Sequence, residues 1–299
     1  METSHQQDVP TAPVIPTEED FLQKYKDYLE AQIKDCYEER WSTSCLEGGN
    51  LSISGFEDQG VSPNMKLGKK LLKEGCELDN AICCGLLADI YKTENKKQKE
   101  QDYWMEAERL FLRGCRKWNS GNCLALAMGY SAHETDPEKR ASIEHYLLKS
   151  CSLENATACQ LLGSFYATPP KLDENKKLFY YAKSCALDNE SACKFLADHF
   201  KQDNQPARAT QFYKEACYLG NMESCLVLAS NYLEAKKYQK SFDLADRACF
   251  FANLPEACFV AGKAKIALGS PVTESDPLIL RGCKLQNFSS PICQGVAKQ

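Results

Sequence analysis

The stretch CSLENATACQLLGSFY, residues 151–166, decides the fold of this chain. It holds two cysteines separated by seven residues, an asparagine between them, and then a glycine and a tyrosine at helical spacing. The arrangement of cysteine, asparagine and cysteine occurs seven times. The first cysteines recur every 32 to 39 residues, at Cys76, Cys115, Cys151, Cys185, Cys217, Cys249 and Cys283. A period of this length is typical of an α-solenoid, in which each repeat is a helix pair that buries its apolar face against its neighbours.

The residues before each first cysteine follow a helical pattern. Leu147, Tyr181 and Tyr213 each lie four positions before such a cysteine and therefore share a helix face with it. The residue directly before the cysteine is always small: Gly75, Gly114, Ser150, Ser184, Ala216, Ala248 and Gly282. Because small side chains allow a neighbouring helix to approach closely, we predict that this helix is the second of its pair.

Another helical pattern begins after the second cysteine. Its packed face carries small and aromatic residues, and Tyr166, Phe200 and Tyr232 recur at one position. We predict that these rings pack between helices; a partner-binding role is the alternative. The asparagine between the cysteines can end one helix in the left-handed conformation or cap the next, and the sequence leaves both roles open. The seven are Asn80, Asn119, Asn155, Asn189, Asn221, Asn253 and Asn287.

Two thiols at this spacing, one near the end of a helix and one near the start of the antiparallel next helix, can approach disulfide distance. A bridge there would join one repeat to the next. In its small-residue–cysteine step, its cysteine spacing and its run of Cys159, Gly163 and Tyr166, the chain resembles the Sel1-like repeat proteins, specifically the cysteine-rich branch with disulfides between consecutive helix pairs. The resemblance covers about residues 36–299. It implies an all-α fold, an α/α solenoid of Sel1-like (TPR-like) helix-pair repeats stapled by disulfides.

The resemblance implies eight disulfides and one free thiol. The eight pairs are Cys36–Cys45, Cys76–Cys84, Cys115–Cys123, Cys151–Cys159, Cys185–Cys193, Cys217–Cys225, Cys249–Cys258 and Cys283–Cys293. Cys84 is assigned to a bridge because it lies eight positions after Cys76 and seven before Tyr91, as in the other repeats. Cys83 is then the odd thiol. It is either a small buried hydrophobe or an exchanging thiol that contacts a partner or an oxidoreductase.

The chain divides into two parts. Residues 1–16 are expected to be a disordered N-terminal segment, and residues 17–299 a solenoid of about seven repeats whose N-terminal capping unit spans 17–65. The segment Ser270–Pro277 is expected to break the last repeat.

The capping unit is expected to start with a helix. We predict that this helix begins at Glu18, with Thr17 as a candidate N-cap. Its expected apolar face consists of Phe21, Tyr25, Tyr28, Leu29 and Ile33.

Composition restricts the function classes. The chain has 299 residues, 43% hydrophobic composition and a net charge of −5, with no apolar run near 18 residues. We therefore expect no transmembrane segment and no nucleic acid as the main partner. The N-terminal residues have neither the basic start and apolar core of a secretory signal nor the Arg-rich character of a matrix-targeting peptide.

Paired cysteines without a secretory signal raise the question of compartment, because disulfides are rare in the cytosol. The mitochondrial intermembrane space would answer it, since cysteine-rich proteins can enter that space without a cleavable presequence and be trapped by oxidation. The resemblance points the same way, to respiratory-chain assembly proteins acting on cytochrome c oxidase. This chain has more repeats than expected for such a protein, and the cytoplasm is the alternative location.

Little in the sequence indicates catalysis, a cofactor or a metal site. The four histidines, His5, His133, His145 and His199, are dispersed and are expected to be surface or core residues. There is no C-x-x-C pair of the zinc-finger type. One S-x-x-K occurs, at Ser191 and Lys194, without the S-D-N and K-T-G elements of serine enzymes that attack penicillin-type compounds. We expect no catalytic, cofactor-binding or metal residues.

The hypothesis that follows is a non-enzymatic, monomeric protein–protein interaction scaffold. Its concave face would hold a peptide or protein subunit, with respiratory-complex subunits and the oxidative import machinery as partners. One alternative is a cytosolic or secreted Sel1-repeat adaptor. Another is a thiol–disulfide or hydrolytic enzyme, for which Cys83 is the one thiol outside the pairing scheme.

Overall fold

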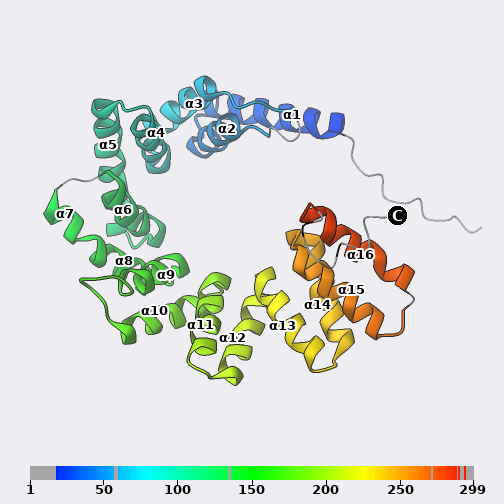
Figure 1. The fold of residues 1–299 in the computed structure, drawn as a ribbon. Helices are drawn as coiled ribbons and strands as arrows, with labels where there is room; N and C mark the ends of the chain where they lie inside the picture. Colours follow the sequence, from blue (N-terminus) through cyan, green and yellow to red (C-terminus); the bar gives the residue numbers. More distant parts are fainter. Residues whose placement is uncertain are drawn as a thin grey trace, which may run out of the picture. The chain divides into compact units, whose positions relative to one another are not determined.

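The computed structural model describes residues 18–56, 60–133, 136–270, 272–287, 289 and 293 (Figure 1). Across these residues the chain is helical, and its β contact is an isolated bridge between Phe56 and Val61. The helices are α1 (Glu18–Tyr37), α2 (Ser42–Ser54), α3 (Met65–Glu77), α4 (Ala81–Thr93), α5 (Lys97–Arg116), α6 (Ser120–His133), α7 (Pro137–Ala141), α8 (Ile143–Ser152), α9 (Ala156–Phe165), α10 (Glu174–Ala186), α11 (Glu190–Gln202), α12 (Pro206–Tyr218), α13 (Met222–Glu234), α14 (Tyr238–Ala252), α15 (Pro255–Ala267) and α16 (Val272–Leu285). The predicted all-α fold of helix-pair repeats is confirmed.

The chain forms two compact units. The first consists of the described residues up to Lys117 together with Met128–Arg140. The second consists of Trp118–Ala127 and the described residues from Ala141 onward. Each unit is built from the same kind of helix pair.

In each pair the two helices pack along one another. In the second unit α9 packs on α10, α11 on α12, and α13 on α14. Each pair therefore begins with the helix that follows a second cysteine and ends with the helix that carries the next first cysteine, which confirms the predicted order. We call these the first helix and the second helix of a repeat. Within this unit, Figure 1 shows α9, α11 and α13 along one side of the row and α10 and α12 along the other.

Disulfides join the second helix of one repeat to the first helix of the next, except that the last one joins Cys283 on α16 to Cys293, which lies beyond the described α-helices. The bridges, with Cα–Cα distances of 4.7 to 5.6 Å, are Cys36–Cys45, Cys76–Cys84, Cys151–Cys159, Cys185–Cys193, Cys217–Cys225, Cys249–Cys258 and Cys283–Cys293. Cys115 and Cys123 are disulfide-bonded as well. Cys83 is a free, buried cysteine.

The turn between repeats explains the recurrent asparagine. Where seven residues separate the cysteines, the asparagine caps the first helix: Asn155 Oδ1 accepts a hydrogen bond from the Ala158 amide at 3.0 Å. The left-handed residue is the one before it, Glu154 with φ 61°. In the last repeats the spacing is longer, and Asn253 itself has φ 50° while Leu254 precedes α15. One inserted residue thus moves the asparagine from the cap to the left-handed position, which it tolerates better than most residues.

Small residues before the first cysteine lie where two helices approach closely, as predicted. The Ser184 hydroxyl is buried on α10 and donates to the Ala156 carbonyl on α9 at 2.8 Å. A Cβ added at Gly282 would lie 2.6 Å from the Phe259 ring. A large side chain at the position before the first cysteine would therefore push the two helices of the pair apart.

The recurring aromatic residues mostly pack inside. Tyr166 is 4% exposed and Phe200 is 6% exposed, and Phe200 stacks on Phe212 at 5.5 Å between ring centroids. Tyr232 is partly buried and lines a surface hollow between α12 and α14. Packing between helices is confirmed for Tyr166 and Phe200.

The ends differ in detail from expectation. Helix α1 is described from Glu18, while Thr17 and the segment 1–16 lie outside the described residues. The expected apolar face of α1 holds except at Tyr28, which is 49% exposed and donates its hydroxyl to Glu47 at 2.7 Å.

The expected break over Ser270–Pro277 is wrong for most of that segment, because it is helical from Val272 onward. Helix α16 begins at Val272 and continues through Pro277. Proline fixes φ near the helical value, so the helix can continue past it at the cost of a backbone hydrogen bond.

Candidate functional site

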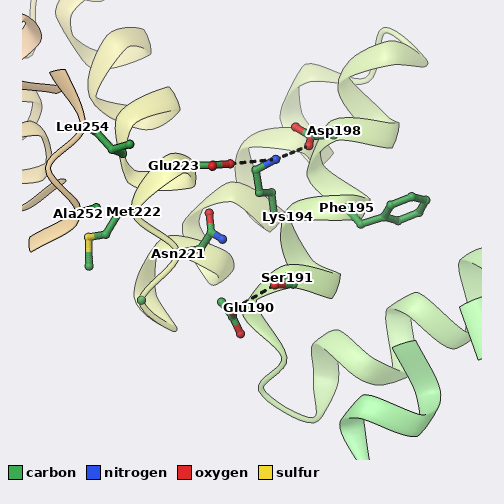
Figure 2. Close-up of a pocket in the computed structure, with 11 residues that line it drawn as sticks. Glu190, Ser191, Lys194, Phe195, Asp198, Asn221, Met222, Glu223, Ala252 and Leu254 are labelled. Atoms are coloured by element: carbon green, nitrogen blue, oxygen red, sulfur yellow. Dashed lines mark hydrogen bonds and ion pairs between the residues drawn. The ribbon is translucent and has the colours of Figure 1, made fainter. Parts of the chain in front are cut away.

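The candidate site is a hollow of about 730 Å³ on the first helices of the second unit (Figure 2). Its walls come from α11, from the turn that starts α13 and from the turn that starts α15. The lining residues are Glu190, Ser191, Lys194, Phe195, Asp198, Gly220, Asn221, Met222, Glu223, Ala252 and Leu254. The hollow therefore spans three consecutive repeats, which no single motif in the sequence marks.

Lys194 lies at the centre of the hollow. Its ammonium group is 2.9 Å from Asp198 on the same helix and 3.4 Å from Glu223 on α13, so it links two repeats. Figure 2 shows both contacts reaching the lysine from opposite sides. The hydrogen bond to Asp198 is the main reason that the pKa of Lys194 is raised, so the side chain stays cationic. Asp198 also accepts a hydrogen bond from the buried Tyr213 hydroxyl.

Carboxylates outnumber cations in this hollow. Glu190, Asp198 and Glu223 line it together with one lysine, and Lys194 is already engaged by Asp198 and Glu223. Phe195 and Met222 add apolar surface. An acidic, partly apolar hollow complements a partner segment that carries a basic side chain beside an apolar one.

Asn221 fixes the rim of the hollow by capping α13. Its Oδ1 accepts from the Ser224 amide at 2.9 Å and from the Ser224 hydroxyl at 2.8 Å. The rim is therefore set by the same turn chemistry that joins every repeat.

Ser191 and Lys194, the S-x-x-K pair, bind different carboxylates. The Ser191 hydroxyl donates to Glu190 at 3.0 Å, while Lys194 is held by Asp198 and Glu223. A lysine in two ion pairs is a poor proton acceptor, and a serine nucleophile needs one. This geometry does not favour the hydrolytic alternative.

Cys83 is fully buried. Burial raises the pKa of its thiol to about 12, so it is protonated and unreactive at neutral pH. A Cβ added at Gly75 would lie 2.5 Å from the Cys83 sulfur, which shows how closely the thiol is packed. The corresponding residues before Cys159 and Cys193 are buried alanines. The packing favours the buried-hydrophobe interpretation over an exchanging thiol.

The histidines lie in separate places. His133 is buried, with its side chain 4% exposed, and is bracketed by two carboxylates, whereas His199 lies 3.3 Å from Asp203. His145 lines a different hollow, and His5 is outside the described residues.

Within the part of the chain that the structure describes, no cluster of histidine, cysteine, aspartate or glutamate could hold a metal ion. The described helices also include none that is both long and apolar enough to span a membrane.

Comparisons with known proteins address the fold. No protein-family model and no curated protein matches this sequence. Among solved structures, a Sel1 repeat protein from Oxalobacter formigenes is 18% identical, with a TM-score of 0.51, and covers 78% of this chain and 98% of its own. Yeast Tom70 is 14% identical, with a TM-score of 0.52, and covers 90% of this chain. The match includes 55% of Tom70, so the chain spans about half the length of that protein. This likeness shows a solenoid fold of the Sel1 and TPR type.

Proposed function

We propose that the protein is a non-enzymatic scaffold that holds a segment of a partner protein on its first-helix layer. The observation that carries the proposal is the acidic hollow around Lys194, whose walls come from three consecutive repeats. Solenoids of this kind offer extended surfaces on which a peptide can contact several repeats in turn.

The chemistry of the hollow indicates the kind of segment. A lysine or arginine side chain of a partner would meet Glu190 and Glu223, and a neighbouring apolar side chain would contact Met222 or Phe195. Glu223 is exposed and Glu190 is half-buried at the surface, so both can change partner without opening the interior. Charge of this kind mainly sets specificity and association rate.

A photo-crosslinking residue at Ser191, introduced into the full chain in its own cells, tests this proposal. We expect one defined partner to be crosslinked, with a yield that falls sharply when Glu190 and Glu223 are both replaced by lysine. The same crosslinker at Glu215, which is exposed on α12, serves as the matched control. Equal capture at both positions, or a yield that is indifferent to the charge reversal, would contradict the proposal.

We further propose that the scaffold works in the mitochondrial intermembrane space, on the assembly of cytochrome c oxidase. Support comes from the dense pairing of cysteines, which needs an oxidising compartment, and from the resemblance to cytochrome c oxidase assembly factor 7. The oxidative import machinery would then be a transient partner that forms the bridges.

Intact mass after alkylation in cells, with and without reduction, tests the compartment. One modified thiol before reduction, that of Cys83, and 17 after it are expected if all other cysteines are bridged. Seventeen in both samples would place the protein in a reducing compartment. Loss of cytochrome c oxidase after depletion of the protein, restored by the wild-type chain, tests the assembly role separately.

A further inference from the structure

We propose that the second-helix layer of the second unit carries a separate docking hollow for an acidic peptide segment that bears apolar side chains. The hollow measures about 610 Å³ and lies between α8 and α10, beside the turn before α6. It is lined by Trp118, His145, Leu148, Lys149, Cys151, Ser152, Phe179, Tyr180 and Lys183. None of these residues lines the acidic hollow on the first helices.

The apolar side chains of this hollow face solvent. Trp118 is 70% exposed, Phe179 is 61% exposed and Leu148 is 37% exposed. Large rings that are exposed together around a recess contribute little to the interior. Clustered aromatic side chains of this kind are typical of the residues that dominate protein interfaces.

Trp118 is also held in an unfavourable backbone conformation. It occupies the left-handed position of the repeat turn with φ 65°, where the Cβ of an ordinary residue is crowded. The same position in the other repeats with this cysteine spacing is Asp79, Glu154, Asp188 or the glycine Gly220. A bulky, exposed ring in this conformation stabilises the fold poorly.

The charged groups around the hollow are all of one sign. Lys149 lies 5.2 Å above the Trp118 ring, and Lys183 is at the matching position of the next repeat, two residues before its cysteine. Neither lysine forms an ion pair with another described residue, and no carboxylate lines the hollow. In a chain with a net charge of −5, this is a local reversal of charge. Carboxylates on a partner would complement it.

A peptide fits this surface better than a nucleic acid or a membrane does. Nucleic-acid binding usually rests on a longer stripe of cations that follows the phosphate backbone. Membrane-surface binding uses an amphipathic face that projects into the lipid headgroups. Here two lysines flank a recess with aromatic walls, which matches an apolar side chain between acidic neighbours.

The test uses the full chain, oxidised, and a fluorescein-labelled peptide in which glutamate surrounds leucine and phenylalanine at helical spacing. A counterpart with glutamine for every glutamate probes charge. We expect the acidic peptide to bind by fluorescence polarisation and the glutamine counterpart to bind at least about tenfold more weakly.

Two variants locate the binding. One variant replaces both Lys149 and Lys183 by glutamate, and the other replaces Trp118 by glycine, the residue at Gly220. Each should weaken the binding of the acidic peptide by about tenfold or more. Trp118→Gly should leave the melting temperature unchanged or raise it, because it relieves the left-handed strain. A structural role for Trp118 would instead lower the melting temperature. The matched control reverses the charge of Lys201 and Lys263, both exposed, and should bind as the wild type does.

Three results would overturn the proposal. The first is no binding of the acidic peptide. The second is binding that the Lys149, Lys183 and Trp118 variants leave unchanged. The third is stronger binding of labelled oligouridylate, or of phosphatidylcholine–phosphatidylserine vesicles, that the same variants abolish. Replacing Glu190 and Glu223 by glutamine should leave the binding of the acidic peptide unchanged. This result would distinguish the hollow from the proposed first-helix site.

Discussion

The interiors of the two units are filled by different chemistry. In the first unit, Trp104 is buried and stacks on His133 at 5.3 Å between ring centroids. His133 contacts Asp89 at 2.9 Å and Glu100 at 3.0 Å. The imidazole of His133 on α6 is thus buried with its partners on α4 and α5, although Asp89 itself is 61% exposed.

The second unit has more stacked pairs of aromatic side chains and no buried histidine of this kind among its described residues. Tyr181 lies on Phe195 with centroids 3.7 Å apart, and Phe200 lies on Phe212 at 5.5 Å. Arg208 covers the outer face of Phe200 at 3.8 Å. Polar groups in this interior are tyrosine hydroxyls, such as that of Tyr181, which is 2.9 Å from the Ser164 hydroxyl, and buried serines that donate to backbone carbonyls, such as Ser184.

This difference shows that the repeat pattern fixes where the helices lie but not which side chains fill the space between them. Apolar rings need only volume, whereas buried polar groups need complete partnering. The first unit should therefore be more sensitive to local change and to pH than the second.

The largest expected effect comes from Gly129 in the first unit. A Cβ there would lie 1.9 Å from the Trp104 ring, against 2.7 Å between a Cβ at Gly163 and the Tyr181 ring in the second. We expect Gly129→Ala to lower the free energy of unfolding by about 3 kcal/mol and Gly163→Ala by about 1–2 kcal/mol, by urea denaturation.

Gly85→Ala is the control for this comparison. A Cβ there meets the Phe111 ring at an ordinary 3.7 Å, so the change should stabilise α4 by about 0.5–1 kcal/mol. Equal losses of unfolding free energy in Gly129→Ala and Gly163→Ala would show that the side chains of the two interiors rearrange equally well around an added methyl group.

The disulfides should not distinguish the units. Cys36–Cys45 and Cys185–Cys193 close loops of nearly the same length, with sequence separations of 9 and 8. Replacing both cysteines of either pair by alanine should cost about 2.5 kcal/mol, measured by urea denaturation. A loss confined to one unit would mean that packing, rather than chain entropy, sets the contribution.

The pH dependence should distinguish them. The hydrogen bond to Asp89 raises the pKa of His133 above its usual value, with Glu100 acting the same way and Lys92 and burial opposing them. This stabilisation is complete below about pH 6.5, the usual histidine pKa, and is lost as the pH rises through the folded value. Hydrogen exchange should therefore show the first unit opening more readily at pH 8 than at pH 6.

His133→Gln is the matched control for that measurement. It should cost about 1 kcal/mol at pH 6 and remove the pH dependence of the first unit. Exchange in the second unit should not change between the two proteins. A wild-type first unit that is equally protected at both pH values would contradict the role of His133.

The smallest effect is expected at Cys83. Cys83→Ala gives the first unit the residue found at Ala158 and Ala192, so the loss should be under about 1 kcal/mol. Partner crosslinking at Ser191 should be unchanged. Loss of a thiol-dependent activity in this variant would favour the enzyme alternative.

Much of the fold followed from local patterns. The spacing of the cysteines and the small residue before each first one predicted the helix pairs and their order, because both act within a few residues of one turn. The double role of asparagine was left open, since it depends on whether one extra residue precedes the cap, as at Asn253. The break expected over Ser270–Pro277 was wrong because Pro277 lies near the start of α16, where its fixed φ suits the helix and only one backbone hydrogen bond is lost.

The candidate sites were not predictable in the same way. Lys194 and Glu223 are 29 positions apart in sequence, and each looks like an ordinary surface charge in its own helix. Trp118 carried one available signal, a bulky residue at the position before the asparagine where the other repeats of the same cysteine spacing have Asp, Glu or Gly. Its exposure and its contact with Lys149 came only from the structure.

The sequence by itself determined the repeat, its turns and the register of its cysteines, because these depend on helix periodicity and on short loops. The tertiary structure alone decided which side chains line a hollow, that His133 is bracketed by Asp89 and Glu100, and that Cys83 is sealed inside. Those properties arise between helices, and the contacts of His133 join residues 33 and 44 positions apart, where local pattern carries no information about distance or burial.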